Sequence, residues 1–499
     1  MLERYYDELK QNINIRENLS LIRKEVKSKE AMDAFLALVG EGELLLELLK
    51  CEEPKVRKNV ALLLGDLQMQ QAASSLFDAY VNETTLFVKS SYLMALGRMD
   101  ASEYLQAFKE RKDALLGKEV PENEKKHTLE ELRELEKLIT GIEGITRHTF
   151  CGLCESCDIL LATNREQRAV TVNEVGELSA TVRRSVSTHP LGVLVHTKEL
   201  IPFTKLRTYR ELLFPIKAKQ KLGNKPAEAA AAVWNSSMPG ILFGSHKEDA
   251  PFYFRLEIKS RMELDKKSSY AKQFAAELER LSERRLVNST SDYEVEIRLV
   301  ETKDGGFAAF YKLFTVPMKR FSYRKNSIAA SIHPATAAML VQLAKPYLKE
   351  NAQILDPFCG VGTMIIERDI CVPAREKYGI DIFGDAVQMA RGNATAAGEL
   401  INYINRDYFD FKHDYLFDEI ITNMPTRGKK TKEEMDTFYS KFFQKSMELL
   451  KRGAVIVMYS NEEGFVKKHL RLRTDYRLLQ EYCIREKEHF YLFVIQYKG

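Results

Sequence analysis

The chain has 499 residues, of which 45% are hydrophobic, and its net charge is only +4. This length allows three domains that each bury a core. No run of eighteen apolar residues occurs, so we expect no membrane span, and the first residues carry no apolar run that would indicate secretion. The seven cysteines, an odd number, fit a reducing cytoplasm.

Residues 1–147 contain an internal repeat with helical periodicity. The segment 55–67 echoes the segment 87–99, and this alignment places Gly65 opposite Gly97, 32 residues later. The period and the helical pattern resemble HEAT-type repeats, which are helix pairs that stack into a solenoid. The resemblance implies an all-α domain over 1–147 with an extended surface for a protein or RNA partner. A helical cap without a partner fits the same pattern.

Four metal-ligating residue types follow at three-residue spacing, namely His148, Cys151, Cys154 and Cys157. Three thiolates and an imidazole at this density could hold a zinc ion. Structural zinc sites usually join two separated pairs of ligands, however, whereas these four residues occupy one ten-residue loop. Reduced structural or redox-responsive thiols are therefore the preferred interpretation, with a metal site as the alternative.

Residues 148–320 are expected to form an α+β domain. Apolar–polar alternation and turn residues predict strands at 252–258, 293–299 and 307–311, a helix over 268–286 and a turn at 303–306. This order of elements resembles the THUMP module of RNA-modifying enzymes. Upstream, apolar runs at 159–161, 169–172 and 192–196 could be strands of a ferredoxin-like half.

A basic segment precedes this module. Between residues 201 and 225, Glu211 is the only acid, and basic residues alternate with Tyr209 and Phe214. Cations interleaved with aromatic rings suit phosphate contacts and base stacking, so we expect a nucleic-acid contact here, with a solvated surface as the alternative. The seven cations are Lys205, Arg207, Arg210, Lys217, Lys219, Lys221 and Lys225.

The stretch Ile354–Thr363 carries the strongest signal in the C-terminal part, residues 321–499. An apolar strand ends in Asp356, and a turn with Gly360 and Gly362 then opens an apolar helix, whose first N–H groups lack partners. Dinucleotide-binding folds also place glycines after a strand. The leading Asp-Pro-Phe and the closing Thr363, however, resemble the first motif of class I S-adenosylmethionine methyltransferases, in the branch that methylates exocyclic amines of nucleic-acid bases.

Three further strand ends fit this resemblance. A strand at 378–382 carries Asp381, an acid that in a doubly wound fold can accept hydrogen bonds from both ribose hydroxyls of a nucleoside. A strand at 401–404 precedes Asp407 and Tyr408; in the family, the acid at this place faces the adenine amino group and its neighbour packs on the ring. Taken alone, Asp381 could cap a helix, and Asp407 could cap a helix or brace a turn.

The resemblance therefore implies S-adenosyl-L-methionine as cofactor and a set of residues that hold it. No histidine is placed in sequence to act as a base for Cys359, which favours a packing role for this thiol over nucleophilic catalysis. Upstream, a basic-aromatic segment at 320–324 is expected to be a crossing strand, and Pro334 opens a helix to Leu348 that abuts the cofactor. The implied cofactor residues are Asp356, Pro357, Phe358, Cys359, Gly360, Gly362, Thr363, Asp381, Asp407, Tyr408 and Pro334.

The loop Asn423–Thr426, after a strand predicted at 418–423, is the expected catalytic segment. Methylation of an aromatic amine needs its lone pair aimed at the donor methyl group, which an Asn423 side-chain carbonyl and a neighbouring backbone carbonyl can achieve by accepting both N–H bonds. Pro425 stiffens this loop. The family places a base-stacking aromatic where this chain has Thr426, so Phe358 or Tyr323 would have to supply the stack. The following segment 427–430 suits phosphate contacts or a solvated turn.

These patterns predict a doubly wound, Rossmann-like methyltransferase sheet over 321–499, preceded by an α+β ferredoxin-like and THUMP-like domain over 148–320 and an all-α HEAT-like domain over 1–147. The resemblance implies a cytoplasmic RNA methyltransferase that forms N2-methylguanosine in tRNA. The alternatives are a catalytically weakened methyltransferase fold that serves as an RNA- or protein-binding module, and an amine methyltransferase acting on DNA adenine or a protein amide.

Overall fold

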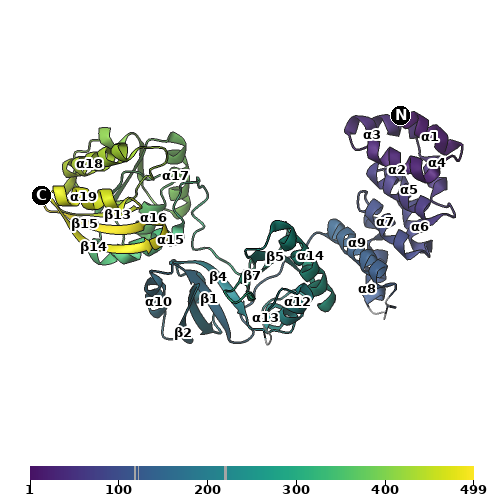
Figure 1. The fold of residues 1–499 in the computed structure, drawn as a ribbon, viewed down its shortest axis with the longest axis horizontal. Coiled ribbons are helices and arrows are strands. Elements are labelled where there is room, and N and C mark those ends of the chain that lie inside the picture. The colour runs from purple at the N-terminus through teal and green to yellow at the C-terminus, as the bar shows by residue number, and fades with distance from the viewer. Residues whose placement is uncertain (117–119, 122, 219–221) are drawn as a thin grey trace. The chain divides into compact units, whose positions relative to one another are not determined.

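The computed structural model describes residues 1–116, 120–121, 123–218 and 222–499, which divide into two compact units, Met1–Arg147 and His148–Gly499 (Figure 1). Within these described ranges, no helix is both long enough and apolar enough to cross a membrane. The first unit is built from helices, and the second contains two β-sheets with helices packed against them.

The first unit buries one apolar cluster between its helices. Pro54 opens α5 at a first helical turn, where a missing N–H costs nothing, and a Cβ on Gly65 would lie 2.7 Å from the Ala95 Cα, so this glycine lets α5 and α7 approach closely. The helices are α1 (Leu2–Lys10), α2 (Ile15–Glu25), α3 (Lys29–Val39), α4 (Glu43–Leu48), α5 (Pro54–Asp66), α6 (Ala73–Asn82), α7 (Leu86–Leu96), α8 (Leu105–Leu116) and α9 (Lys125–Glu143), with 3₁₀ turns η1 (Gln70–Ala72) and η2 (Ser102–Tyr104).

The second unit opens with an eight-stranded sheet in the order β2-β3-β1-β4-β8-β7-β5-β6, in which only the β7–β5 and β5–β6 pairs are parallel. Its strands are β1 (Cys157–Thr163), β2 (Arg184–His189), β3 (Gly192–Thr197), β4 (Tyr209–Ile216), β5 (Phe252–Lys259), β6 (Leu286–Asn288), β7 (Val295–Glu301) and β8 (Phe307–Leu313). The accompanying helices are α10 (Arg168–Gly176), α11 (Ile201–Thr204), α12 (Pro226–Trp234), α13 (Met238–Gly244) and α14 (Leu264–Leu281).

Two expectations for this region were wrong. The apolar run 169–172 is part of α10 and not a strand, because Thr171 and Val175 form the buried face of an amphipathic helix there. The basic-aromatic segment 320–324 is a turn rather than a crossing strand. Its shape is fixed by Arg320, whose guanidinium donates to the carbonyls of Leu206 and Arg210 at 2.8 and 2.9 Å.

The seven-stranded sheet has the order β11-β10-β9-β12-β13-β15-β14, with parallel pairing from β11 to β13 and antiparallel pairing of β15 with both neighbours. Its strands are β9 (Gln353–Asp356), β10 (Glu376–Asp381), β11 (Asn402–Asn405), β12 (Phe417–Asn423), β13 (Leu450–Ser460), β14 (Tyr476–Arg485) and β15 (Phe490–Tyr497). The helices are α15 (Pro334–Ala344), α16 (Thr363–Cys371), α17 (Gly384–Ala397), α18 (Lys432–Leu449) and α19 (Glu463–Leu472), with short 3₁₀ turns η3 (Lys345–Tyr347), η4 (Tyr408–Asp410) and η5 (Glu486–Glu488).

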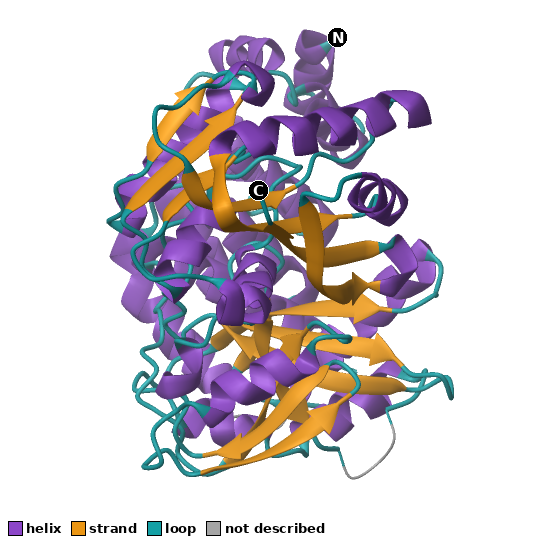
Figure 2. Cartoon of the chain, turned by 90° about the vertical axis from the view of Figure 1, so that its left-hand side faces the viewer, coloured by secondary structure: helices purple, strands orange, loops and turns teal. Residues whose placement is uncertain are grey.

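Helices cover both faces of this sheet, as the purple helices around the orange strands show (Figure 2). Ile420 of β12 packs in the cluster with α18, whereas its neighbour Ile421 packs in the cluster with α15 and α16, as the alternation of side chains along a strand requires. The chain leaves β9 toward β10 on one side and later returns to β12 on the other. The strand order therefore reverses between β9 and β12, which is where doubly wound sheets form a ligand crevice.

The two sheets of the second unit are held together by buried polar contacts. Arg207, just before β4, forms a bidentate ion pair with Glu367 of α16 at 2.8 and 2.9 Å. Nearby, the Asn164 and Gln167 side chains donate to the carbonyls of Ile484 and Cys483, both at 2.8 Å. Because Glu367 lies one turn after the start of α16, the position of the eight-stranded sheet is tied directly to the helix that follows the glycine loop.

Candidate active site

The loop after β9 has the backbone geometry that its glycines predict. Gly360 and Gly362 have φ angles of +52° and +82°, a region that favours glycine, and Gly362 is the N-cap of α16. A Cβ on Gly362 would overlap the Tyr403 hydroxyl, whereas a Cβ on Gly360 would meet no atom within 4 Å. Gly362 is therefore required by packing behind the loop, while Gly360 leaves open space on the other side, where a ligand can approach the backbone.

Asp381, at the end of β10, faces this loop. Its Oδ2 accepts a hydrogen bond from the Gly360 N–H at 2.8 Å, and its Oδ1 accepts one from the Phe383 N–H at 2.9 Å. Each carboxylate oxygen can accept a second bond, so both can still receive a hydroxyl donor. The contact joins the glycine loop and the second strand end into one site, as the sequence predicted.

Buried oxygens without partners lie at the same edge. Asp356 Oδ1 accepts from the Phe358 N–H at 3.2 Å, but Oδ2 forms no hydrogen bond with the described residues, and neither does the Thr363 hydroxyl. Burial of the Asp356 side chain raises its pKa to about 8. A buried carboxyl oxygen with spare hydrogen-bonding capacity beside a glycine loop fits a ligand that carries amine and hydroxyl groups, as the amino-acid and ribose parts of S-adenosyl-L-methionine do.

Asp407 and Tyr408 follow β11, and they differ in exposure. Asp407 caps the turn η4 by accepting from the Phe409 N–H at 2.9 Å, which is the capping role that the sequence left open. Tyr408 lies in the core, only 2% exposed, with its hydroxyl 3.0 Å from Ser446 of α18. The structure therefore places Tyr408 in the packing beneath the site and leaves the half-buried Phe409 nearer the surface.

The segment after β12 lies next to the glycine loop, because β12 pairs directly with β9. Met424 N donates to Tyr459 O at 2.9 Å, which anchors the start of the loop on β13. Asn423 is half-buried, Thr426 is exposed, and among the described residues no side chain hydrogen-bonds the Asn423 amide. The side chain of Asn423 is thus available as a hydrogen-bond acceptor at the strand-order reversal.

Neither of the two rings expected to replace the missing aromatic at position 426 is exposed. Tyr323 is 3% exposed and donates to Glu367 at 2.5 Å, so its ring cannot stack on a base. Phe358 packs against Tyr408, Phe438 and Phe442 at centroid distances of 5.4 to 6.2 Å. The expectation for Tyr323 is wrong because its hydroxyl donates to Glu367, a buried carboxylate on α16. The sequence around Tyr323 gives no sign of this partner, which lies 44 residues further along the chain.

Several predicted site residues support the loop without reaching its open side. Cys359 is buried, and burial raises the pKa of its thiol well above the ordinary value, which agrees with a packing role. Pro357 is buried beside it. Pro334 is the first residue of α15, and that end of the helix contacts β4 through the bond from Arg210 to Thr336.

The structure adds residues that the sequence did not single out. Asn393 of α17 is fully buried and donates to the Val361 carbonyl at 3.0 Å, which holds the glycine loop from behind. Ile382 and Phe383, directly after Asp381, are 61% and 70% exposed. An exposed apolar pair directly after Asp381 could pack against a flat ring, and only the observed exposure distinguishes these residues from core positions.

In the described structure, His148, Cys151, Cys154 and Cys157 are not grouped as metal ligands. His148 is taken up by Glu294, whose carboxylate lies 2.6 Å from Nδ1, and by the Ala250 carbonyl at 3.1 Å. Cys157 is buried in the core, which raises the pKa of its thiol to about 12, whereas Cys151 and Cys154 are exposed. Across the described ranges, no three His, Cys, Asp or Glu side chains are grouped to hold a metal ion.

The expected basic segment 201–225 is also largely occupied. Tyr209 and Phe214 are 0% and 1% exposed, because β4 is an inner strand covered on both faces, so neither ring can stack on a base. Arg207 pairs with Glu367, Lys217 with Asp158 and Lys225 with Glu228. Lys219 and Lys221 lie outside the described residues.

Comparison with known proteins identifies the domain that carries the site. Residues 322–487 match the family model described as RMKL-like, methyltransferase domain. A tRNA (guanine(10)-N2)-dimethyltransferase of Methanothermobacter thermautotrophicus is 27% identical over 155 residues, which are 30% of this chain and 45% of that protein. The chain thus spans less than half the length of this curated relative. Residues 322–487 are therefore a methyltransferase domain, a class whose methyl donor is S-adenosyl-L-methionine.

Solved structures agree with the fold. SMU.472, determined as a complex with SAH, covers 69% of this chain and 98% of its own with a TM-score of 0.50 at 17% identity. TrmN from Thermus thermophilus covers 69% of this chain and 100% of its own, with a TM-score of 0.49 at 17% identity. At this level of identity the likeness with SMU.472 concerns the fold alone. It extends beyond the methyltransferase domain, since it takes in more than two thirds of the chain.

Proposed function

We propose that this chain transfers a methyl group from S-adenosyl-L-methionine to the exocyclic N2 of guanine in tRNA. The observation that carries the proposal is the available acceptor Asn423, half-buried beside the glycine loop at the strand-order reversal of a methyltransferase domain. The guanine and tRNA assignments rest on the name of the Methanothermobacter relative and on the resemblance of residues 148–320 to RNA-binding modules.

In this proposal the residues around Gly360 and Asp381 hold the cofactor. Asp381 accepts hydrogen bonds from the ribose hydroxyls, and the orphaned Asp356 Oδ2 receives a donor from the amino-acid part. Ile382 and Phe383 flank the purine, with Asp407 near its amino group. When bound, the cofactor supplies an electrophilic methyl group on a sulfonium centre.

The catalytic loop orients the nucleophile. The Asn423 side-chain carbonyl accepts one N–H of the guanine amine, and a backbone carbonyl of the loop accepts the other, with Pro425 keeping the loop stiff and Thr426 at the rim. Two accepted N–H bonds draw the nitrogen lone pair out of conjugation and fix its direction. Positioning of this kind supplies most of the rate when both reactants are held in line.

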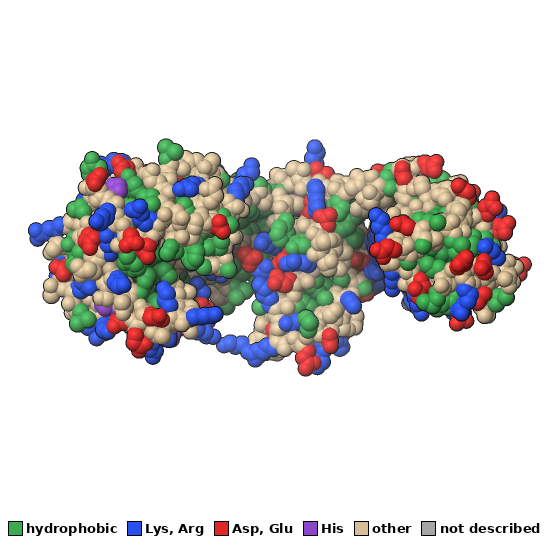
Figure 3. Space-filling model, turned by 90° about the horizontal axis from the view of Figure 1, so that it is seen from above, with side chains coloured by type: hydrophobic (Ala, Val, Ile, Leu, Met, Phe, Trp, Pro, Cys, Tyr) green, Lys and Arg blue, Asp and Glu red, His purple; other side chains and the backbone are tan. Residues whose placement is uncertain are grey.

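The other regions have separate parts in the proposal. The order β1-α10-β2-β3-α11-β4 is that of a ferredoxin-like half, and the strands from β5 to β8 follow the expected THUMP-like order, so residues 148–320 are assigned to RNA binding. Residues 1–147 carry 22 Lys or Arg against 27 Asp or Glu, while the rest of the chain is positive. Acidic side chains gather on this unit, at the right of Figure 3. A net negative, HEAT-like unit favours a protein partner over RNA.

All seven cysteines lack a disulfide partner, which fits a reducing compartment, and we assign the activity to the cytoplasm.

A second candidate is a methyltransferase fold with weak or no turnover that serves as a binding module. The exposed Thr426 favours it, because neither Tyr323 nor Phe358 offers a ring to the target base. Base stacking contributes about 1–3 kcal/mol per base, so its absence lowers target affinity without removing the acceptor at Asn423. Methylation of DNA adenine or of a protein amide has no comparable support in the structure.

Transfer of labelled methyl to bulk tRNA, followed by nucleoside mass spectrometry, tests the proposal. We expect N2-methylguanosine, and we expect Asn423→Ala to lower the rate at saturating substrate about a hundredfold while cofactor affinity stays constant. Asn402→Ala, at the exposed start of β11, is the matched control and should leave the rate unchanged. Cofactor binding without turnover on any RNA would establish the binding module instead.

A further inference from the structure

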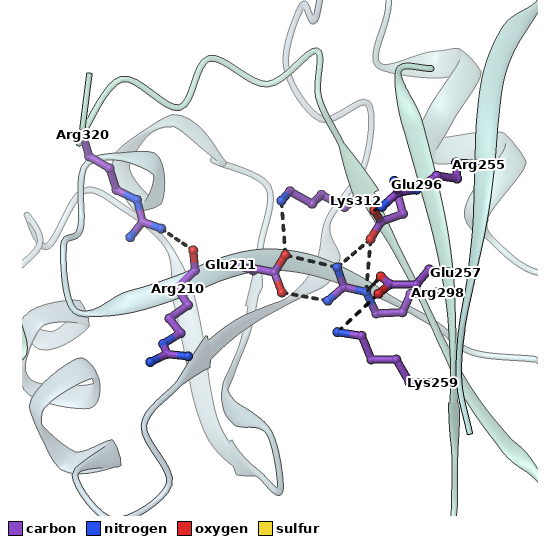
Figure 4. Close-up of polar contacts among 9 residues, drawn as sticks. All are labelled: Arg210, Glu211, Arg255, Glu257, Lys259, Glu296, Arg298, Lys312 and Arg320. Atoms are coloured by element: carbon purple, nitrogen blue, oxygen red, sulfur yellow. Dashed lines mark hydrogen bonds and ion pairs between the residues drawn. The ribbon is translucent and has the colours of Figure 1, made fainter. Parts of the chain in front are cut away.

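The charged face of the eight-stranded sheet is neutralised by its own residues (Figure 4). Glu211 of β4 accepts from Arg298 at 2.7 and 3.1 Å and from Lys312 at 3.2 Å. Arg298 also pairs with Glu296 and Glu257 at 2.5 and 2.8 Å. These cations are already paired, so an incoming phosphate would have to compete with carboxylates for them.

Three arginines beside this network are different. Arg210 projects away from Glu211 and donates to the Thr336 hydroxyl at 3.3 Å, and Arg320 donates only to backbone carbonyls (Figure 4). Arg324 has a buried Nε without a hydrogen-bond partner. Within the described residues, none of these three guanidiniums forms an ion pair with an Asp or Glu. We call Arg210, Arg320 and Arg324 the arginine cluster.

The nearby acids do not neutralise the cluster. Glu367 is held by Arg207 and Tyr323, and Glu211 is held by Arg298 and Lys312. Glu174 accepts from the Thr208 hydroxyl at 2.6 Å and from two backbone N–H groups. Each acid already has donors of its own, and in the part of the chain that the structure describes none of them forms an ion pair with an arginine of the cluster.

The pKa of His333 is affected by burial of its ring and by the charges of the three arginines. This histidine is the N-cap of α15, and its ring lies 6.3 Å from that of Phe321. Partial burial of the ring, followed by the charges of Arg210, Arg324 and Arg320, lowers the pKa of His333 to about 4. His333 is therefore neutral at pH 7, and three like charges converge on the start of a helix, which itself favours an anion.

Two members of the cluster, Arg210 and Arg320, border hollows. A groove of about 410 Å³ is lined by Arg210, Arg320, Phe314 and Phe321, and a cavity of about 170 Å³ is lined by Arg210, Thr336, Asn164 and Arg485. Phe314 is 47% exposed in the groove. Arg210 belongs to both hollows, so an extended chain with charge along its length could contact it from either side.

The smaller cavity leads toward the catalytic loop. Arg485 donates to the Tyr459 hydroxyl at 3.1 and 3.3 Å, and Tyr459 pairs with Asn423 across β13 and β12. Paired residues in a sheet place their side chains on the same face, here the face that packs on α15. Tyr459 therefore links Arg485, which lines the cavity, to Asn423, which carries the proposed catalytic amide.

We propose that the arginine cluster holds a phosphodiester of the RNA next to the nucleotide that enters the catalytic loop. The assignment rests on the proposed function, because it takes its ligand from the substrate of that reaction. Guanidinium groups match phosphate oxygens bidentately and stay charged at all relevant pH values. A diester at this place would satisfy cations that the protein leaves unpaired, and it would add affinity for the RNA without contacting the reacting groups.

Binding of a tRNA transcript to the full-length protein across a range of KCl concentrations tests this proposal. Each contacted phosphate contributes roughly 0.7–0.9 to the slope of log affinity against log salt. Arg210→Gln and Arg324→Gln should each reduce the slope by about that amount and weaken binding severalfold, and the double variant should lose about twice as much. Arg210→Lys and Arg324→Lys should retain most of the slope, because lysine keeps the positive charge. Arg471→Gln, at an exposed position of α19, should retain all of it.

Kinetics separate this proposal from the proposed function. In the glutamine variants we expect KM for RNA to rise, while kcat and cofactor affinity stay near wild type. Wild-type slope and KM in the double variant would overturn the arginine assignment even if methylation proceeds. Absence of methylation by the wild type would instead overturn the proposed function. Inorganic phosphate at matched ionic strength probes for an isolated anion site, and cluster-dependent phosphate binding with unaltered RNA binding would also overturn the assignment.

Discussion

The ion pair between Arg207 and Glu367 makes the sharpest prediction about stability. The Glu367 side chain is 1% exposed and the Arg207 side chain 23%, and two hydrogen bonds of 2.8 and 2.9 Å join them. Arg207 also donates to the Arg320 carbonyl at 2.7 Å. Replacement of Arg207 by Met keeps the aliphatic stem but leaves a buried carboxylate with Tyr323 as its remaining side-chain donor.

Removal of one partner from a buried pair typically costs about 3–5 kcal/mol, since the other charge stays buried without compensation. Because part of the Arg207 side chain reaches water, we expect Arg207→Met to lower the free energy of unfolding by about 3 kcal/mol, near the low end of this range. Arg280→Met is the matched control. Arg280 also forms a bidentate contact, with Glu277 at 2.7 and 2.8 Å, but its side chain is 56% exposed. This control should cost less than about 1 kcal/mol.

The effect should depend on pH. Burial raises the pKa of Glu367 above its ordinary value even with Arg207 in place, and loss of the arginine raises it further. A carboxyl whose pKa is raised by folding destabilises the folded protein above the pKa that it has in the unfolded chain. This destabilisation grows as the pH rises toward the raised pKa of the folded state. The difference between Arg207→Met and wild type should therefore shrink toward pH 5. The double variant Arg207→Met/Glu367→Gln should recover part of the loss at pH 8.

Urea unfolding followed by tryptophan fluorescence suits this test. The chain has a single tryptophan, Trp234 of α12, which packs on the core of the eight-stranded sheet; Arg207 lies just before β4 of that sheet. Circular dichroism would follow all helices at the same time, and a difference between the two midpoints would show that the regions no longer unfold together. Equal losses for Arg207→Met and Arg280→Met, independent of pH, would refute the reasoning.

Three further predictions concern the methyltransferase domain. Asp381→Ala should weaken cofactor binding by about 1.5–3 kcal/mol, roughly ten- to a hundredfold, in titration calorimetry, whereas Asp385→Ala on the neighbouring helix turn should not; equal affinities would remove the ribose assignment. Asp356→Asn should gain stability relative to wild type as pH rises from about 5 to 8, by at most about 1.4 kcal/mol per pH unit, because burial raises the Asp356 pKa to about 8 and wild type must give up that proton on unfolding; a flat difference in denaturation midpoints would contradict this. Tyr323→Phe should cost about 1–3 kcal/mol in thermal unfolding through the lost hydrogen bond to Glu367 yet leave kcat for methylation near wild type, and a large fall in kcat at full stability would restore Tyr323 to the site.

Much of the backbone geometry around the glycine loop could be predicted because its signals are local. A strand that ends in Asp356, glycines at positions that need positive φ, and an apolar helix beginning at Thr363 follow one another within a few residues. The end of β10 at Asp381 follows the same logic, and the structure joins it to the glycine loop by one hydrogen bond. Short-range backbone geometry restricts such a segment to few conformations, so the pattern is informative by itself.

The basic segment 201–225 shows how far local reasoning reaches. Alternating cations and rings look like a binding surface, but β4 is an inner strand and buries Tyr209 and Phe214. Arg207 forms an ion pair with Glu367, 160 residues further along the chain. The charge of a residue can be read from its type, whereas its availability depends on partners brought by other elements.

The sequence by itself determined the nature of the C-terminal domain, since a glycine loop and its flanking strand ends are specified by neighbouring residues. Only the tertiary structure decided which side chains remain open to a ligand. The side chains of Tyr323, Tyr408 and Arg207 form buried hydrogen bonds and are not open to a ligand. The side chains of Asp356, Asn423 and Arg210 can still form further hydrogen bonds. The physical reason is that desolvation and pairing are set by long-range packing, which no window of consecutive residues contains.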